Sequence, residues 1–183
     1  MKARILTAAL LAALVATAAS FASQPTGQDR ANAARACSAL RTSMGVSLFR
    51  ATYGTVASNR MNAFGRCVSQ WAHTEHQNQI NARAACTAEQ NDSTFASTHD
   101  GKTFAQYYGT GSKGANAFGR CVSSKVRAAR AEARQNTLNA ARDCRAERNS
   151  MGGPAFRAKY GKNANDFNAF GKCVSAHAKA PSV

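Results

Sequence analysis

The sequence predicts an all-α protein built from three tandem helical-hairpin repeats, each stapled by a disulfide bond and joined to the next through a shared long helix. Three observations support this prediction. The octapeptide NAFGRCVS occurs at 62–69 and 116–123, and NAFGKCVS follows at 168–175. Two cysteines accompany each copy at matched spacing. Neither proline nor a second glycine interrupts the chain between one copy and the next cysteine. Repetition on this scale indicates an array of small structural units.

The N-terminal residues predict export. Lys2 and Arg4 precede a fifteen-residue apolar run at 5–19, and the tripeptide Ser-Phe-Ala at 20–22 fits a cleavage site. The run is too short to favour a membrane span. We therefore expect residues 1–22 to be a signal peptide and the mature protein to be secreted. Six cysteines in an exported chain predict three disulfide bonds, and the absence of a C-x-x-C motif argues against zinc.

Alignment on the octapeptide divides the mature chain into three units and a short tail. The first cysteine of each unit precedes a phenylalanine by 12, 18 and 12 residues, and a tyrosine follows that phenylalanine four residues later each time. The second unit therefore carries a six-residue insertion, whose polar and turn-forming residues predict an exposed loop. The predicted units are repeat 1 at 23–72, repeat 2 at 73–126 with its insertion near 91–101, repeat 3 at 127–180, and a tail at 181–183.

Each unit is expected to form a helix, a short helix and another helix. The phenylalanine and tyrosine lie on one face of the short helix, and the glycine after the tyrosine suits a left-handed C-terminal cap. The asparagine of NAFG suits an N-cap. We expect the octapeptide glycine to allow close packing, with anion binding at the helix N-terminus as the alternative. We also expect each phenylalanine–tyrosine pair to pack against the octapeptide phenylalanine of its own unit. These pairs are Phe49 and Tyr53, Phe104 and Tyr108, and Phe156 and Tyr160, and the octapeptide residues are Phe64, Phe118 and Phe170.

The uninterrupted stretches decide the disulfide pairing. Residues 62–90 and 116–149 should each form one continuous helix. Cys67 and Cys86 would then lie about 28 Å apart on one helix, and Cys121 and Cys144 about 34 Å apart, because an α-helix rises about 1.5 Å per residue. Bridged cysteines need Cα atoms within roughly 7 Å. The simplest remaining arrangement joins Cys37 to Cys67, Cys86 to Cys121, and Cys144 to Cys173.

The repeat pattern resembles a known kind of protein. A cysteine followed by A-E-R, then A-F-x-x-K-Y-G, then N-A-F-G-K-C-V-S is similar to a repeat in exported, uncharacterised proteins of high-GC Gram-positive bacteria. The likeness covers nearly all of the mature chain. It implies export and repetition, and it implies no activity and no functional residues.

Signals for an enzyme or a metal site are weak. His73, Glu75 and His76 lie close together on a predicted helix, and the two histidines could share a metal if another ligand approached. Asp143 and Glu147 lie one helical turn apart and could form an acid–base pair. For both groups we favour an ordinary solvated helical face, and we expect no catalytic residue, no metal and no cofactor.

Positive charge is the remaining feature that could carry a function. The chain has a net charge of +15, and removal of Lys2 and Arg4 with the signal peptide leaves +13. The three units carry +5, +1 and +7. At about 100° per residue, six arginines fall within one arc of the second long helix, although Leu138 falls there too. These candidate anion-binding residues are Arg127, Arg130, Arg134, Arg142, Arg145 and Arg148.

The sequence therefore favours a non-catalytic exported module that binds an anionic envelope polymer, nucleic acid or lipid headgroups through a basic helix face. A structural or spacer protein, whose charge serves solubility, is the alternative. A small hydrolase or metalloenzyme is a more remote alternative. Because aromatic residues do not alternate with the arginines, we expect contact with phosphate or carboxylate groups and no base stacking.

Overall fold

The structure is a computed structural model that describes residues 24–55, 59–111, 113–161 and 168–179. Within these residues the chain forms eight helices and no strand, apart from one isolated bridge between Thr110 and Ala115. The predicted all-α fold is confirmed. The predicted signal peptide and the tail at 181–183 lie outside the described residues.

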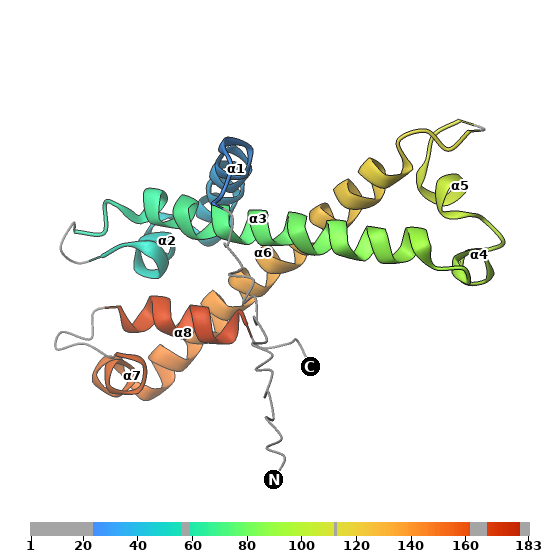
Figure 1. Cartoon of the computed structure of the whole chain (residues 1–183). Coiled ribbons are helices and arrows are strands. Elements are labelled where there is room, and N and C mark those ends of the chain that lie inside the picture. The colour runs from blue at the N-terminus through green and yellow to red at the C-terminus, as the bar shows by residue number, and fades with distance from the viewer. Residues whose placement is uncertain (1–23, 56–58, 112, 162–167, 180–183) are drawn as a thin grey trace, which may run out of the picture.

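Two long helices form the frame of the molecule. Helix α3 (Ala63–Asn91) has 29 residues and α6 (Ala117–Met151) has 35, and the two cross near their middles (Figure 1). Both match the uninterrupted stretches of the sequence. Helix α1 (Gly27–Met44) packs against α3 and begins with a capping box, in which the side chains of Thr26 and Asp29 each accept a hydrogen bond from the other residue's N–H group.

The shorter helices lie at the ends of this frame (Figure 1). Helices α2 (Val46–Tyr53), α5 (Phe104–Tyr108) and α7 (Gly153–Tyr160) each carry the phenylalanine and tyrosine of one unit. The two rings lie about one turn apart, with centroids 5.0, 5.0 and 4.9 Å from each other. Helix α8 (Ala169–His177) contains the third octapeptide and packs against both α6 and α2.

Three disulfide bonds join the helices in the predicted pairs. They are Cys37–Cys67, Cys86–Cys121 and Cys144–Cys173. All six cysteines are fully buried, and a small separate core surrounds each bond. Each bond closes a loop of about 30 residues, which contributes on the order of 3–4 kcal/mol of stability in the chain-entropy model. Such cross-links compensate for thin, alanine-rich cores.

The insertion of the second unit is more structured than expected. It contains a short helix, α4 (Phe95–Thr98), and Phe95 is only 3% exposed. The Phe95 ring stacks on His99 and meets Phe104 edge-on. Most of the insertion is exposed as predicted, but the prediction of a loop was wrong at 95–98, where Phe95 supplies the second unit with part of its core.

The glycine after each tyrosine has a role other than the predicted one. Gly54, Gly109 and Gly161 have φ values of −79°, −77° and −69°, so none adopts the left-handed conformation. At Gly54 an added Cβ would lie 2.7 Å from the Arg50 carbonyl oxygen, and at Gly109 it would lie 2.3 Å from that of Ala105. Glycine is needed at these two positions because the chain folds back against the preceding helix.

The three octapeptides differ in how they pack. The alanine before the phenylalanine is buried in each copy, whereas Phe64 is 38% exposed and Phe170 only 6%. Phe118 is partly buried against the second core. The Phe170 ring lies 6.2 Å from that of Phe156. The predicted packing is therefore confirmed in the third unit and wrong in the first.

The octapeptide glycines and asparagines also differ between copies. An added Cβ at Gly65 or Gly119 would meet open space, whereas at Gly171 it would lie 2.5 Å from the Thr52 carbonyl oxygen. The close-packing explanation thus holds for Gly171, which brings α8 against α2 of the first unit. Each asparagine occupies the N-cap position, but no side-chain capping bond forms; the Asn62 amide instead exchanges hydrogen bonds with Thr55.

Candidate anion-binding groove

An ion pair between a buried glutamate and a partly exposed arginine links the two long helices at their crossing. Glu75 of α3 is fully buried. The Arg130 guanidinium of α6 donates from Nε to Glu75 Oε1 at 2.6 Å and from a terminal nitrogen to Oε2 at 2.5 Å. This bond to Glu75 raises the pKa of Arg130. Arg130 therefore neutralises a structural carboxylate and differs from the other arginines of the predicted row.

A second buried carboxylate fixes α1 on α3. Asp29 is fully buried; its Oδ2 accepts hydrogen bonds from the Thr26 N–H and hydroxyl and lies 3.1 Å from His76 Nδ1. Gln79 donates to Asp29 Oδ1 at 2.6 Å. Burial raises the pKa of the Asp29 carboxyl, but the bonds from Thr26 and His76 outweigh burial and lower it below its usual value.

These contacts separate the three residues considered as a metal or catalytic group. His73 is exposed, Glu75 is bound to Arg130, and His76 contacts Asp29. The expectation of a solvated face was wrong for Glu75 and His76, because α6 and α1 cover that side of α3. Among the described residues, the one cluster with ligand-like spacing is Cys144, Cys173 and His177, whose two sulfurs form a disulfide bond.

Asp143 and Glu147, for which we favoured an ordinary solvated face over an acid–base pair, have different surroundings. Asp143 is exposed, whereas Glu147 accepts hydrogen bonds from Lys159 at 2.5 Å and from the Tyr160 hydroxyl at 2.8 Å. The bond from Lys159 and then that from Tyr160 lower the pKa of Glu147. A carboxylate held ionised by such partners is poorly suited to exchange protons near neutral pH.

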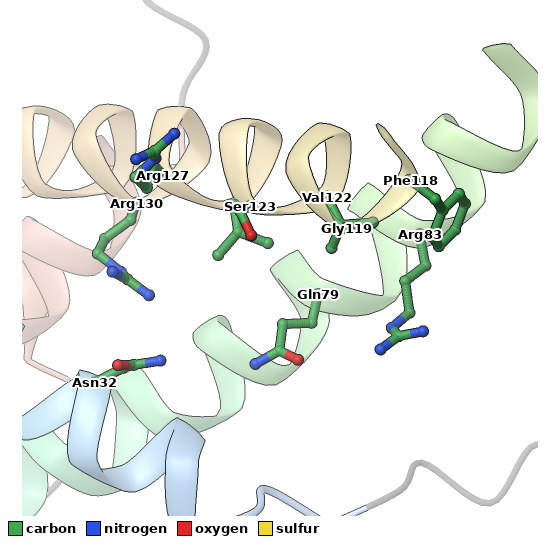
Figure 2. A pocket seen from close by; sticks show the side chains of 10 residues that line it. Asn32, Gln79, Arg83, Phe118, Gly119, Val122, Ser123, Arg127 and Arg130 are labelled. Atoms are coloured by element: carbon green, nitrogen blue, oxygen red, sulfur yellow. The ribbon is translucent and has the colours of Figure 1, made fainter. Parts of the chain in front are cut away.

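Beside the crossing, α1, α3 and α6 enclose a groove of about 470 Å³. We call it the crossing groove. It continues into a smaller hollow of about 340 Å³ between α1 and α6, and the two share Asn32, Arg127 and Arg130. Together they form the basic groove. The crossing groove is lined by Asn32, Gln79, Arg83, Phe118, Gly119, Val122, Ser123, Val126, Arg127 and Arg130 (Figure 2).

Four exposed arginines from three helices line the basic groove. Arg35 comes from α1, Arg83 from α3, and Arg127 and Arg134 from α6. None of the four forms an ion pair with any residue that the structure describes. The nearby carboxylates Asp29 and Glu75 are buried and already hydrogen-bonded. The groove therefore presents positive charge that the described residues leave uncompensated.

The predicted arginine row is thus divided by the fold. Arg127 and Arg134 line the basic groove, and Arg130 anchors the crossing. Arg145 and Arg148 line a different groove of about 700 Å³ against α2, and the exposed Arg142 lines neither. Leu138 interrupts the row because its side chain packs against the core of the first unit.

Sequence reasoning missed Arg35 and Arg83, which lie on helices far from α6 in the chain. It also missed Phe118 as a groove residue, since that residue was assigned to the core. No signal within one helix could have identified these residues, because the groove exists only where α1, α3 and α6 meet.

No known protein-family model, curated protein or solved structure matches this chain.

Proposed function

We propose that this protein is a non-catalytic exported repeat protein that binds a phosphate-bearing anionic polymer through the basic groove. The observation that carries the proposal is the convergence of four arginines, without ion-pair partners among the described residues, on one groove. Arginine suits this role because its planar guanidinium forms bidentate hydrogen bonds with phosphate and stays charged at every physiological pH.

The electrostatics of the site favour a polymer over a single small ion. The four arginines come from three helices and line two connected hollows, so their charges are distributed along a path. A chain that carries one charge per repeating unit can meet several such arginines and release several counterions. A single small anion would engage only part of the groove.

The disulfide bonds support a location outside the reducing cytoplasm. Three bonds among six cysteines form and persist in oxidising compartments. We propose that residues 1–22 are a signal peptide, which would direct the protein to that location. In the described part of the chain, no helix has the length and apolarity that a membrane crossing requires.

The alternative is a structural or spacer protein without a specific ligand. The rigid cross-linked frame favours it, and under this alternative the arginines serve only solubility. The two functions differ in whether the location of an arginine on the surface matters. A solubilising charge has the same effect anywhere on the surface, whereas a binding charge acts only in the groove.

A binding comparison of two triple variants tests the proposal. One variant replaces Arg35, Arg127 and Arg134 with glutamine. The matched control replaces Arg142, Arg145 and Arg148, which removes the same charge from the same face of α6 outside the basic groove. The probe is a fluorescently labelled abasic deoxyribose-phosphate strand, followed by anisotropy. Arg130 is kept in both variants because it neutralises Glu75.

We expect the groove variant to bind the strand at least tenfold more weakly than the parent, and the control to lose much less. Glutamine has nearly the helix propensity of arginine, so both variants should fold; circular dichroism checks this. Equal losses in the two variants, or parental binding in both, would overturn the proposal in favour of the structural alternative.

A further inference from the structure

The crossing groove has an apolar floor between its charged ends. Phe118, Val122 and Val126 are spaced four residues apart on α6 and form a strip about 12 Å long, at about 1.5 Å rise per residue. Phe118 and Val122 are only partly buried. The volume of about 470 Å³ lies in the range of small-molecule binding sites. The groove is therefore large enough for one ring-bearing unit of a polymer.

Positive charge lies at both ends of this floor. Figure 2 shows Arg83 beside Phe118 at one end and Arg127 at the other, where Arg130 also lies but is paired with Glu75. Gln79 and Asn32 lie across from α6 along the side between them. Gln79 Nε2 donates to Asp29, and Asn32 Oδ1 accepts from Arg35 and Gln28. Gln79 Oε1 and Asn32 Nδ2 can accept and donate hydrogen bonds at the edge of a bound ring.

This arrangement restricts the occupant. An anionic lipid has one charged end, so its apolar tail would meet an arginine at the far end of the groove. A polyol phosphate carries charge on both sides but offers no apolar face to Phe118 and the two valines. A nucleotide inside a strand has a flat base with phosphates on both sides, and it satisfies the floor, the amides and both charged ends.

We propose that the crossing groove seats one nucleotide of a single-stranded nucleic acid, with its base on the Phe118–Val122 floor and its flanking phosphates toward Arg83 and Arg127. This inference rests on the proposed function, because it names the polymer that the basic groove takes. It also revises the expectation of no base stacking. Arginine and aromatic residues do not alternate along α6, but α3 brings Arg83 beside Phe118 in space (Figure 2).

The molecule contains its own control for Phe118. The first octapeptide is identical in sequence, and its Phe64 is 38% exposed but lines none of the grooves described above. We compare Phe118→Leu with Phe64→Leu. Leucine keeps apolar volume against the second core and removes only the aromatic ring, so the fold is expected to survive in both variants.

The experiment measures affinity for a labelled oligothymidylate and for an abasic strand of equal length. We expect the parent to bind the oligothymidylate about tenfold more tightly, since stacking of a base on an aromatic side chain adds to the affinity for a single strand. Phe118→Leu should lose this preference and keep its affinity for the abasic strand. Phe64→Leu should behave like the parent.

Other outcomes separate the two proposals. Equal binding of both strands by the parent would overturn the nucleotide inference and leave phosphate binding intact. Binding of neither strand would overturn both. A preference for oligothymidylate that survives in Phe118→Leu would place the base elsewhere and overturn the inference. Binding to anionic phospholipid vesicles in place of the strands would also overturn it, in favour of a lipid surface.

Discussion

The first and third units place different chemistry at the same positions of the repeat. Three residues after its first cysteine and four after its second, the first unit has Leu40 and Trp71. Both are buried, and the Trp71 indole donates to the Tyr53 hydroxyl at 3.2 Å. This unit closes with a buried apolar cluster in which the tyrosine hydroxyl is hydrogen-bonded to an indole.

The third unit has Glu147 and His177 at the corresponding positions. The Tyr160 hydroxyl lies 2.8 Å from Glu147 Oε2 and 3.2 Å from His177 Nε2, and Lys159 adds an ion pair. This cluster is partly exposed. The second unit follows the same pattern, with Glu89 accepting from Tyr108 at 2.9 Å and pairing with Lys125.

The difference shows which parts of the repeat define the unit. The disulfide between two helices and the phenylalanine–tyrosine pair are common to all three units, whereas the residues around the tyrosine hydroxyl change from apolar to charged. The cross-linked frame therefore tolerates either cluster. Stability should depend on different residues at equivalent positions, as the following predictions state in order of expected effect.

The largest difference should come from the octapeptide phenylalanines. Phe170→Ala should lower the free energy of unfolding by about 4 kcal/mol, because it empties a buried site. Phe64→Ala should lower it by less than about 1 kcal/mol, because that ring is partly in solvent. Denaturant unfolding with the disulfides intact measures both. Similar losses at the two positions would contradict the packing described for the octapeptides.

The next difference concerns the position three residues after the first cysteine of a unit. Leu40→Ala should lower the free energy of unfolding by about 3 kcal/mol, since Leu40 is fully buried. Glu147→Ala should have a clearly smaller effect, because exposed ion pairs contribute little. The same unfolding measurement applies. A larger loss for Glu147→Ala would reverse the comparison between the two clusters.

Acid should destabilise the third unit before the first. The hydrogen bonds from Lys159 and Tyr160 lower the pKa of Glu147 in the folded protein, so its contribution is present above the ordinary glutamate pKa and is lost as pH falls through the lowered one. Hydrogen exchange should show α7 losing protection in acid before α2. In Glu147→Gln, protection of α7 should no longer fall with pH in this range. Simultaneous loss in the parent would rule out this effect.

The smallest effect concerns Tyr108 of the second unit. Burial and then the hydrogen bond to Glu89 raise its pKa to about 12. The stabilisation is therefore complete below about pH 10, the ordinary tyrosine value, and is lost as pH rises toward 12. Ultraviolet titration should show a late phenolate transition that disappears in Tyr108→Phe. Its persistence in that variant would assign the transition to another tyrosine.

Much of the frame could be predicted because its causes lie within short stretches of sequence. The two long helices could be predicted because no proline and no glycine beyond the octapeptide's interrupts them, and helix length then excluded the wrong cysteine pairs. The prediction of left-handed glycine caps failed because Gly54 and Gly109 lie against Arg60 and Gly114, where the chain returns after each turn. The burial of Phe95 in the insertion could not be predicted, because it depends on packing against rings that follow later in the chain.

The groove was less predictable because it depends on where helices cross. Arg130 and Glu75 are 55 residues apart, and the helical period of α6 alone cannot show that a buried carboxylate faces Arg130. The same crossing brings Arg35 and Arg83 to Arg127. The helical period of α6 predicts which side of that helix is basic. It cannot predict which residues of α1 and α3 complete the groove.

The salt dependence of binding tests the central claim, that arginines of the basic groove contact phosphates. Affinity for the abasic strand is measured over a range of salt concentrations for the parent and for the variant with Arg35, Arg127 and Arg134 replaced by glutamine. Each phosphate contact contributes about 0.7 to the slope of log affinity against log salt for a single strand, so the account predicts a slope smaller by about 2 in the variant. An unchanged slope would show that these arginines do not contact phosphate and would contradict the account.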